Sequence, residues 1–334
     1  MRALAARRAD QRRAGRPVGC RAAGTTSRPL TGNCCGLDEA GPADLHELPL
    51  LRDLLTDELW RLATDGVLGT VRDHTQPGDT VKLGGAVAVV TGGGTGIGRA
   101  VCLALARAGA GGVVVNYSRS AADAEELVAE LGDLGCAAMA ERADVADDAQ
   151  VRAMAGRVTD RFHRVDVLVN NSGMTRATPH EDLDGLTDEV WHEVLSVNLL
   201  GAFHCARSFA PALKRARGSV INVASISGYR AGGSSIAYGV SKAALLQLTR
   251  NLAVALAPNV RVNAVAPGTV STRLQTTLHG EQGFAERARR ERQSVPLQRT
   301  AGPEDVAEVV LGLLGMDMVT GEAVIIDGGK HVVY

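Results

Sequence analysis

Short apolar runs alternate with longer helical segments from residue 81 to the end of the chain, and this alternation constrains the fold more than any other feature. Residues 98–108, 121–134 and 237–257 have helical periodicity. Seven runs rich in β-branched residues are predicted to be strands: 86–91, 112–116, 137–142, 165–170, 219–224, 260–265 and 323–326. Apolar strands separated by helices form right-handed βαβ units, whose parallel sheet is covered on both faces. The sequence therefore predicts an α/β fold with a doubly wound, parallel, seven-stranded sheet and helices on both faces.

The α/β domain is predicted to cover residues 81–334. The first 80 residues form an N-terminal extension to it. Residues 1–37 hold eight arginines and one acid, Asp10, without hydrophobic periodicity, which is typical of a disordered tail. The same Arg-rich, acid-poor composition is an argument for an organellar transit peptide. Residues 38–80 are acidic, and five leucines spaced by three or four predict one amphipathic helix over residues 49–63. This helix either packs on its own domain or binds a partner.

The overall composition excludes several classes of protein. Hydrophobic residues make up 45% and charged residues 22% of the 334 residues, and the formal net charge is −1, which argues against global disorder and against a basic nucleic-acid-binding protein. No apolar run reaches the roughly 18 to 20 residues that cross a membrane. Six cysteines form no Cys-x-x-Cys pair and eight histidines no His-Glu-x-x-His motif, so we predict reduced thiols and no metal site. We expect a cytoplasmic protein, or an organellar one if the N-terminus is a transit peptide.

A glycine-rich turn follows the first predicted strand directly and precedes a helix. It reads Thr91-Gly-Gly-Gly-Thr-Gly-Ile-Gly-Arg99. Glycines in such a turn adopt positive φ and let a pyrophosphate approach the backbone, while the free N–H groups of the helix start face the phosphates. This context indicates a Rossmann-type dinucleotide site, with these predicted contacts: Gly92, Thr95, Gly96, Ile97 and Gly98.

The end of the second predicted strand bears on which dinucleotide binds. An acidic residue there accepts hydrogen bonds from the adenosine ribose and repels a phosphate. Between the end of this strand and Asp123 the chain has no acidic residue, and Ser118 and Arg119 can both donate to a phosphate. The sequence therefore favours NADP(H), with NAD(H) as the alternative if Arg119 is only a solvated loop charge.

Tyr238 and Lys242 are four residues apart in a predicted helix, so both project from one face. An unperturbed tyrosine has a pKa of about 10, and a neighbouring ammonium lowers that pKa toward neutrality. Only four of the 36 basic residues are lysines, so Lys242 marks a place that needs a compact charge rather than a planar guanidinium. We therefore expect Tyr238 to act as an acid/base whose pKa Lys242 lowers.

Together these features resemble the short-chain dehydrogenase/reductase family from about residue 82 to the C-terminus. The motifs that carry the resemblance occur in the family's order: the glycine-rich turn, Asn170-Asn-Ser-Gly173, Asn198, Ser225, Tyr238-x-x-x-Lys242 and Pro267-Gly268. The resemblance implies a catalytic tetrad. Tyr238 would exchange a proton with a carbonyl oxygen, and Ser225 would donate a hydrogen bond to that oxygen. Lys242 would bind the nicotinamide ribose, and Asn198 would hold a water that links the lysine to bulk solvent.

The same resemblance implies further cofactor contacts. Asp144 would lie at the adenine ring, and the segment from Asn170 would line the adenosine side. Residues 267–272 would close over the nicotinamide. Beyond the glycine-rich turn and the phosphate donors, the implied cofactor residues are Asp144, Val145, Asn171, Gly173, Tyr238, Lys242, Pro267, Gly268, Val270 and Thr272.

The sequence motifs constrain the identity of the substrate less than they constrain the family. Segments such as Asn222-Val-Ala-Ser225 and the ending Asp327-Gly-Gly329 are most similar to 3-oxoacyl-carrier-protein reductases, which implies an NADP(H)-dependent reductase of fatty acid biosynthesis. Sugar, polyol and steroid dehydrogenases share these segments, so an alcohol dehydrogenase that uses NAD or NADP is the alternative. Residues 271–299, the family's lid, carry six arginines and three glutamates, a charge that can attract an acyl-carrier-bound substrate. The resemblance also implies a homotetramer, with shared faces on the helix over 189–214 and the helix of Tyr238.

Overall fold

All seven predicted strands form, and they lie in one sheet of order β3-β2-β1-β4-β5-β6-β7. Every neighbouring pair is parallel. The computed structural model describes residues 83–333. The strands are β1 (Val87–Val90), β2 (Gly112–Tyr117), β3 (Ala137–Arg142), β4 (Val167–Asn170), β5 (Ser219–Val223), β6 (Arg261–Pro267) and β7 (Ala323–Ile326). The predicted α/β fold with a doubly wound parallel sheet is therefore confirmed.

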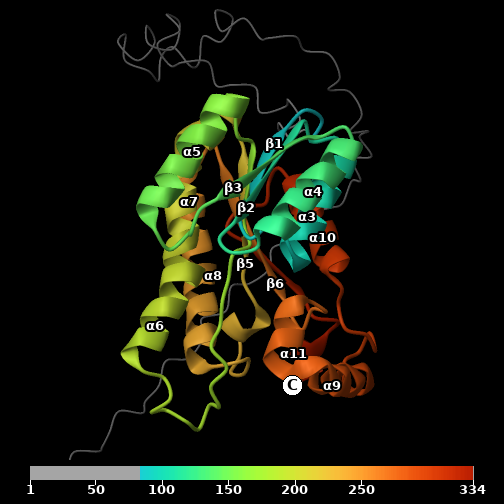
Figure 1. Cartoon of the computed structure of the whole chain (residues 1–334). Coiled ribbons are helices and arrows are strands. Elements are labelled where there is room, and N and C mark those ends of the chain that lie inside the picture. The colour runs from blue at the N-terminus through green and yellow to red at the C-terminus, as the bar shows by residue number, and fades with distance from the viewer. Residues whose placement is uncertain (1–82, 334) are drawn as a thin grey trace, which may run out of the picture. The chain divides into compact units, whose positions relative to one another are not determined.

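Helices connect the strands and cover both faces of the sheet. They are α3 (Gly96–Arg107), α4 (Ala121–Asp133), α5 (Asp148–Phe162), α6 (Asp188–Leu195), α7 (Gly201–Ala216), α8 (Ile236–Leu256), α9 (Arg273–Ser294), α10 (Pro303–Leu314) and α11 (Lys330–Val333). Helices α3, α4 and α10 lie on one face, and α5, α7 and α8 lie on the other (Figure 1). Parallel strands need such crossovers, because a tight hairpin can join only antiparallel strands.

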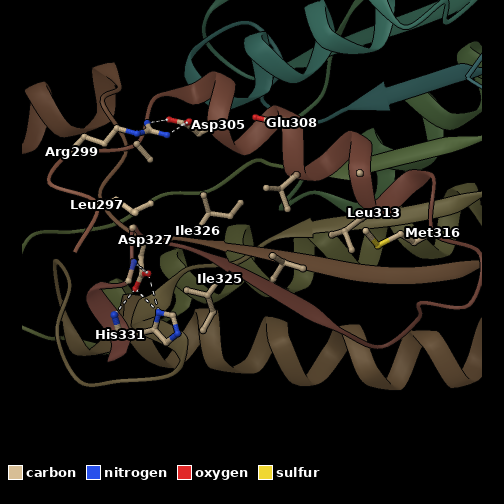
Figure 2. Close-up of a pocket in the computed structure, with 16 residues that line it drawn as sticks. Leu297, Arg299, Asp305, Glu308, Leu313, Met316, Ile325, Ile326, Asp327 and His331 are labelled. Carbon is tan, nitrogen blue, oxygen red and sulfur yellow. Dashed lines mark hydrogen bonds and ion pairs between the residues drawn. The ribbon is translucent and has the colours of Figure 1, made fainter. Parts of the chain in front are cut away.

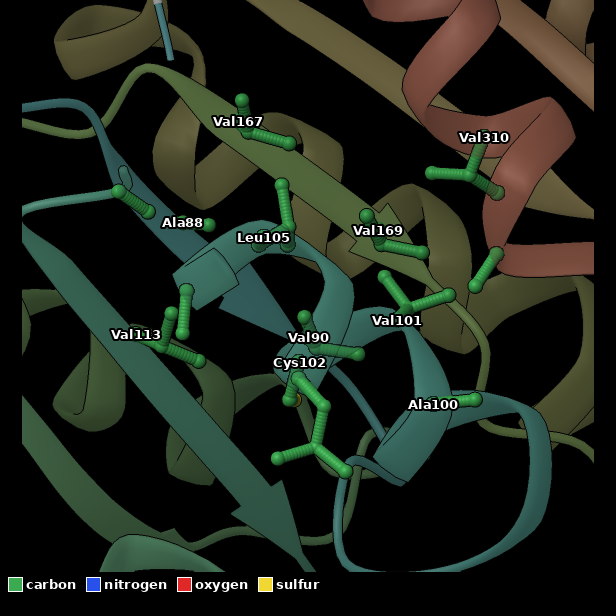
Figure 3. Close-up of a cluster of buried hydrophobic side chains, with 14 of the residues drawn as sticks. Ala88, Val90, Ala100, Val101, Cys102, Leu105, Val113, Val167, Val169 and Val310 are labelled. Atoms are coloured by element: carbon green, nitrogen blue, oxygen red, sulfur yellow. The ribbon is translucent and has the colours of Figure 1, made fainter. Parts of the chain in front are cut away.

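Side chains of the strands alternate between two apolar layers. In β1, Ala88 and Val90 pack in one layer and Val89 in the other, because successive side chains of a strand point to opposite faces. Figure 3 shows the first layer, in which Val101 of α3 and Val310 of α10 meet the sheet. Strands β1, β4 and β5 are buried at every position, which explains why their sequences are nearly unbroken apolar runs.

The winding of the chain along the sheet reverses between β1 and β4. Strands β2 and β3 extend to one side of β1, and β4 to β7 extend to the other. In open parallel sheets, ligands bind beyond the carboxyl ends of the strands at such a switch point. Thr91 follows β1 and Asn171 follows β4, so the glycine-rich turn and the Asn171 segment meet at this point.

Two helical segments are irregular, and the first of them was predicted as one continuous helix. The helix expected over residues 189–214 is divided, since α6 and α7 are joined by a π-helical turn, η2 (Ser196–Leu200), which contains Asn198. Such turns occur inside helices and are frequent at functional sites. In the lid region, α9 is bent at Gly280, whose φ of 69° interrupts the helix.

The predictions for residues 1–80 lie outside the described residues and stay predictions. They comprise the disordered tail over residues 1–37, the acidic segment over residues 38–80 and its amphipathic helix. Within residues 83–333, no helix is both long enough and apolar enough to cross a membrane.

Candidate active site

The glycine-rich turn forms a tight cradle at the start of α3. Gly92 and Gly96 have φ of 60° and 53°, which favour glycine. A Cβ on Gly98 would lie 2.3 Å from the carbonyl oxygen of Gly92, so the close approach of helix and turn excludes any side chain there. Thr95 is the N-cap of α3, yet its side chain makes no capping hydrogen bond, and Ile97 follows in the first turn. The N–H groups of this helix start are thus available to an anion, as a bound pyrophosphate requires.

Asn171 joins the two strands of the switch point. Its Nδ2 donates to the carbonyl oxygens of Thr91 (2.9 Å) and Gly92 (3.0 Å). In return, the Thr91 hydroxyl accepts hydrogen bonds from the backbone N–H groups of Asn171 (3.0 Å) and Ser172 (2.9 Å). These four bonds fix the shape of the turn, so the side chain of Asn171 acts on the cofactor cradle through the backbone. The role of Thr91 was not predicted, although a threonine directly after a strand can bond backbone groups in this way.

The adenosine end of the cradle is open and basic. Ser118 and Arg119 follow β2 and are exposed. A hydrogen bond from Arg176 lowers the pKa of Glu193, and the positive charges of Arg176 and Arg119 add to this effect. The charge of Arg119 is therefore close enough to α6 to act on Glu193. No acidic residue stands between β2 and Asp123, so this end suits a phosphorylated ribose.

Asp144 and Val145, predicted to contact the adenine, are held by local bonds. The Asp144 carboxylate accepts from the N–H of Ala146 (3.0 Å), and its own N–H donates to the side chain of Gln150 (3.1 Å). Val145 is buried, and its carbonyl oxygen lies 3.0 Å from Nδ1 of His204. This turn is rigid and half-buried beside β3, and its contact with an adenine ring stays a prediction.

Ser225, Tyr238 and Lys242 are brought together as the sequence predicts. Ser225 is the N-cap of a short 3-10 helix, η3 (Ile226–Gly228), and its hydroxyl accepts from the N–H of Ser227 (3.1 Å). Ser235 begins α8 in the same manner and accepts from the N–H of Tyr238 (3.2 Å). The hydroxyl groups of Ser225 and Tyr238 lie close enough to affect the pKa of the phenol, and Nζ of Lys242 lies 5.7 Å from the centre of the tyrosine ring.

The electrostatics of this site differ from the expectation. Burial raises the pKa of Tyr238, and the nearby Ser225 hydroxyl acts in the opposite direction. The predicted lowering by Lys242 is wrong for this form of the protein, because the ammonium points to the backbone and donates to the carbonyl oxygen of Val223 (2.8 Å). Burial lowers the pKa of Lys242 itself to about 8.

Asn198 holds the segment after β4 against α8. Its Oδ1 accepts from the N–H of Met174 (2.8 Å), and its Nδ2 donates to the carbonyl oxygen of Met174 (2.9 Å) and to Oγ of Ser241 (2.9 Å). Ser241 in turn donates to the carbonyl oxygen of Tyr238 (2.7 Å). Both donors of the Asn198 amide are used, which leaves only a second lone pair on Oδ1 for the predicted water. Ser241 was missed, although its position three residues after Tyr238 places it on the same side of α8.

Gly173 lies where the catalytic groups and the segment after β4 meet. A Cβ at this position would stand 3.4 Å from Nζ of Lys242 and 3.5 Å from Oδ1 of Asn198. The predicted cofactor residue Gly173 is therefore part of the same small space as the tetrad.

The first half of the 267–272 loop packs beside the residue that follows Ser225. Pro267 ends β6, and the N–H of Gly268 donates to the carbonyl oxygen of Ile326 at the end of β7 (2.8 Å). A Cβ on Gly268 would lie 2.8 Å from Cβ of Asp327 and 3.7 Å from the side chain of Ile226, the residue after Ser225. Only glycine fits where the chain at residue 268 passes so close to Asp327.

The second half of the loop reaches the glycine-rich turn. Val270 forms an isolated parallel bridge with Ala301, and the N–H of Ser271 donates to the carbonyl oxygen of Ala301 (3.0 Å). Thr272 is the N-cap of α9, and its methyl group lies 3.3 Å from the position of a Cβ on Gly96. The loop thus spans the site from Ser225 to the cradle, as expected of a segment that covers a dinucleotide.

A cavity of about 640 Å³ lies apart from this site, between β7, α10 and α11. Figure 2 shows it between the ion pair of Arg299 with Asp305 (2.6 Å) and the hydrogen bond of His331 with Asp327 (2.9 Å). None of the predicted catalytic residues lines it, so the volume of a cavity does not identify the site here. Within residues 83–333, no group of three or more histidine, cysteine or carboxylate side chains is placed to hold a metal ion.

Known proteins match this chain over the same region. Residues 92–331 match a family profile described as enoyl-(acyl carrier protein) reductase. The ketoacyl reductase 2 assigned to the granaticin polyketide synthase of Streptomyces violaceoruber is 45% identical over 247 residues, which cover 74% of this chain and 96% of that protein. The 3-oxoacyl-[acyl-carrier-protein] reductase of Synechocystis is 37% identical over 248 residues, covering 73% and 96%.

Solved structures agree with these matches. A crystal structure of a short-chain dehydrogenase from Burkholderia cenocepacia in complex with NADP has a TM-score of 0.68 and 34% identity, and the match covers 75% of this chain and 99% of that one. The family profile over residues 92–331 includes the glycine-rich turn from Gly92 onward and the Ser225–Tyr238 site. The chain therefore belongs to the short-chain dehydrogenase/reductase family of NAD(P)-dependent oxidoreductases, in which it resembles the 3-oxoacyl-carrier-protein reductases.

Proposed function

We propose that the protein is an NADP(H)-dependent reductase that converts a ketone to a secondary alcohol, with a 3-oxoacyl thioester as its substrate class. The observation that carries this proposal is the pair of hydroxyl groups on Ser225 and Tyr238, with the Lys242 ammonium 5.7 Å from the tyrosine ring. Two hydroxyl donors that meet beside a dinucleotide cradle suit a carbonyl oxygen.

Each catalytic side chain has a separate task in this reaction. A bound nicotinamide supplies a hydride to the carbonyl carbon. Tyr238 gives its phenolic proton to the carbonyl oxygen, so the C=O π bond is replaced by one C–H and one O–H bond. Ser225 donates a hydrogen bond to the same oxygen and stabilises the negative charge that develops on it.

The pKa shifts of Tyr238 and Lys242 suit a reaction that reduces a ketone. Because burial raises the pKa of Tyr238, the phenol stays protonated at neutral pH and is ready to act as an acid. After proton transfer the phenolate lies near the Lys242 ammonium, which is still mostly charged at pH 7, since its pKa is about 8. In this structure, however, the ammonium donates to the carbonyl oxygen of Val223 and does not lower the pKa of Tyr238, so the task we propose for Lys242 is to bind the nicotinamide ribose.

Sequence and relatives both support NADP(H) and a thioester substrate. Ser118 and Arg119 would hold the 2′-phosphate of the adenosine, and no acid follows β2 to repel it. The NADP complex of the Burkholderia protein agrees with this choice. The names of the Streptomyces and Synechocystis relatives support a 3-oxoacyl substrate, carried by a carrier protein. Three exposed arginines of residues 271–299, Arg289, Arg290 and Arg292, form no ion pair among the described residues and would attract such an acidic partner.

A substrate panel tests the proposal. The full-length protein is incubated with NADPH or NADH and with 3-oxoacyl thioesters of coenzyme A and of a carrier protein, and the absorbance of the nicotinamide is followed. Sugar, polyol and steroid alcohols and ketones complete the panel. We expect NADPH oxidation to be fastest with a 3-oxoacyl thioester. If the protein oxidises only a sugar, polyol or steroid alcohol, the alternative dehydrogenase replaces this proposal.

We further propose a homotetramer in the cytoplasm. Two apolar side chains on α8 support a shared face on this helix, since Val240 is 45% and Val254 is 82% exposed. Light scattering of the purified protein measures the oligomeric state directly.

A further inference from the structure

A buried carboxylate on the lid helix ties together three separate parts of the chain. Glu291 of α9 is 7% exposed. Its Oε1 accepts a hydrogen bond from the hydroxyl of Thr269, at 2.6 Å, and another from Nζ of Lys330, at 2.5 Å. Arg287, one turn earlier in α9, has its Nε 3.7 Å from the same oxygen. Thr269 belongs to the loop after β6, and Lys330 begins α11, so one oxygen atom joins the loop, the lid helix and the C-terminal helix.

The residue types fit this role closely. Burial of a carboxylate destabilises the fold unless the carboxylate is paired and hydrogen-bonded. The hydrogen bonds of Glu291 must therefore offset the cost of its burial. Lys330 is one of only four lysines in a chain that otherwise uses arginine. Its side chain is 19% exposed, and a compact ammonium can reach an oxygen that already accepts from Thr269.

Thr269 stands at the middle of the loop that spans the candidate active site. On one side of it, Gly268 is bonded to Ile326, and a Cβ on Gly268 would stand 3.7 Å from the side chain of Ile226, the residue after Ser225. On the other side, Ser271 is bonded to Ala301. The backbone bonds hold both halves of the loop, and the side-chain bond to Glu291 holds its centre.

We propose that Glu291 is a positioning residue, which sets the loop over residues 268–272 against the bound nicotinamide through its hydrogen bond with Thr269. The proposal rests on the proposed function, because that function puts the nicotinamide under this loop. The competing explanation is that Glu291 only stabilises the fold. The two differ in their consequence, since a purely structural residue changes the melting temperature without a matching change in coenzyme affinity.

Four variants of the full-length protein separate these explanations. Glu291→Gln keeps the size and one acceptor but removes the charge, and Thr269→Val removes the hydroxyl at nearly constant shape. Thr269→Ser restores the hydroxyl. Asp166→Asn is the matched control, because Asp166 is an equally buried carboxylate that pairs with Arg164 at the amino edge of the sheet.

Three readouts are compared for each variant. The Kd values of NADPH and NADH come from nicotinamide fluorescence, and the melting temperature comes from thermal unfolding. Hydrogen–deuterium exchange of the Gly268 and Ser271 amides is measured in the cofactor-free protein. Both amides are hydrogen-bonded in the structure, so faster exchange reports a loosened loop.

We expect Glu291→Gln and Thr269→Val each to raise the Kd of the preferred coenzyme by about 5- to 50-fold and to speed exchange at both amides. The double variant should raise the Kd little more than the stronger single one, because in this proposal Glu291 acts on the loop only through the Thr269 hydroxyl. Thr269→Ser should return to within about two-fold of the wild type, and Asp166→Asn should lower only the melting temperature. If Glu291→Gln does not fold, the comparison of Thr269→Val with Thr269→Ser is sufficient to test the positioning role.

Unchanged Kd values and amide exchange in Thr269→Val would overturn the positioning role, as would additive effects in the double variant. A wild-type protein that binds NADPH but reduces no 3-oxoacyl thioester would refute only the proposed substrate, because none of these readouts depends on turnover. A wild type that binds neither coenzyme would overturn both proposals.

Discussion

Arg273, the first residue of the lid helix, donates two hydrogen bonds to the carboxylate of Asp123 in the first turn of α4, at 2.8 and 3.1 Å. The two residues are 150 positions apart in the sequence. Helix α4 follows β2 and α9 follows β6, and three strands lie between these two in the sheet. The ion pair therefore crosses the carboxyl edge of the sheet, above the strand that leads into the glycine-rich turn.

Breaking this pair should speed the release of the coenzyme. Asp123→Asn and Arg273→Gln are each expected to increase the dissociation rate of NADPH by about 2- to 5-fold, since exposed pairs are weak. The charge reversal Asp123→Arg with Arg273→Asp should restore the slow rate, and high salt should reduce all differences. Stopped-flow fluorescence measures the rate. Equal rates in all four proteins would show that the pair does not hold the lid.

Replacing the catalytic phenol should abolish turnover and spare coenzyme binding. In Tyr238→Phe the ring is kept but the proton donor is lost, so kcat should fall by about 100- to 10,000-fold. The Kd of NADPH should stay close to the wild-type value. Steady-state kinetics and fluorescence titration check the two halves of this prediction, and persistent turnover would remove Tyr238 as the acid.

Reversing the charge after β2 should shift the coenzyme preference. With Arg119→Glu, the preference for NADPH over NADH is expected to fall by at least about 10-fold, because a charged hydrogen bond to the phosphate is replaced by repulsion. Arg107→Glu, at the far end of α3, changes the net charge equally and serves as the control. The ratio of kcat/KM values is the measurement. An unchanged ratio would mean that Arg119 is only a solvated loop charge.

Arg261 should be a major contributor to stability. This half-buried guanidinium at the start of β6 donates to the carbonyl oxygens of Leu313 (3.0 Å), Leu314 (2.7 Å) and Val319 (3.4 Å), which close the C-terminus of α10. Arg261→Met leaves the carbonyl oxygen of Leu314 without this donor and removes one of the donors to Leu313 and Val319, which are also bonded by Met316 and Asn263. It should lower the free energy of unfolding by about 2 kcal/mol. Arg261→Lys should recover part of this loss. Urea unfolding measures both, and an unchanged midpoint in Arg261→Met would contradict the assignment.

The buried Lys242 should make stability depend on pH. Its pKa is about 8 in the folded protein, below its ordinary value of 10.5. Between these values the unfolded chain holds a proton that the folded chain does not, so stability rises with pH over this window. The free energy of unfolding of the cofactor-free wild type, relative to Lys242→Met, should therefore increase from pH 8 to pH 10.5. A difference that is flat or falls over this window would contradict the prediction.

Local patterns account for what could be predicted. The strand bounds deviate by at most two residues from the predicted ones, because apolar runs between turns carry that information themselves. Tyr238 and Lys242 share a helix face, so their spacing was sufficient to pair them. The lowering of the Tyr238 pKa by Lys242 was predicted wrongly, since the direction depends on burial and on the carbonyl oxygen of Val223, which the spacing of two residues does not reveal.

The sequence by itself determined the parallel sheet, the glycine cradle and the shared helix face of Tyr238 and Lys242, because each depends on residues close together in the chain. Only the tertiary structure decided what those side chains touch. The bonds of Asn198 to Met174 and Ser241, of Glu291 to Thr269 and Lys330, and of Arg273 to Asp123 join positions between 22 and 150 residues apart. Such partners are chosen by how the strands are ordered and the helices packed, and no local pattern encodes that choice.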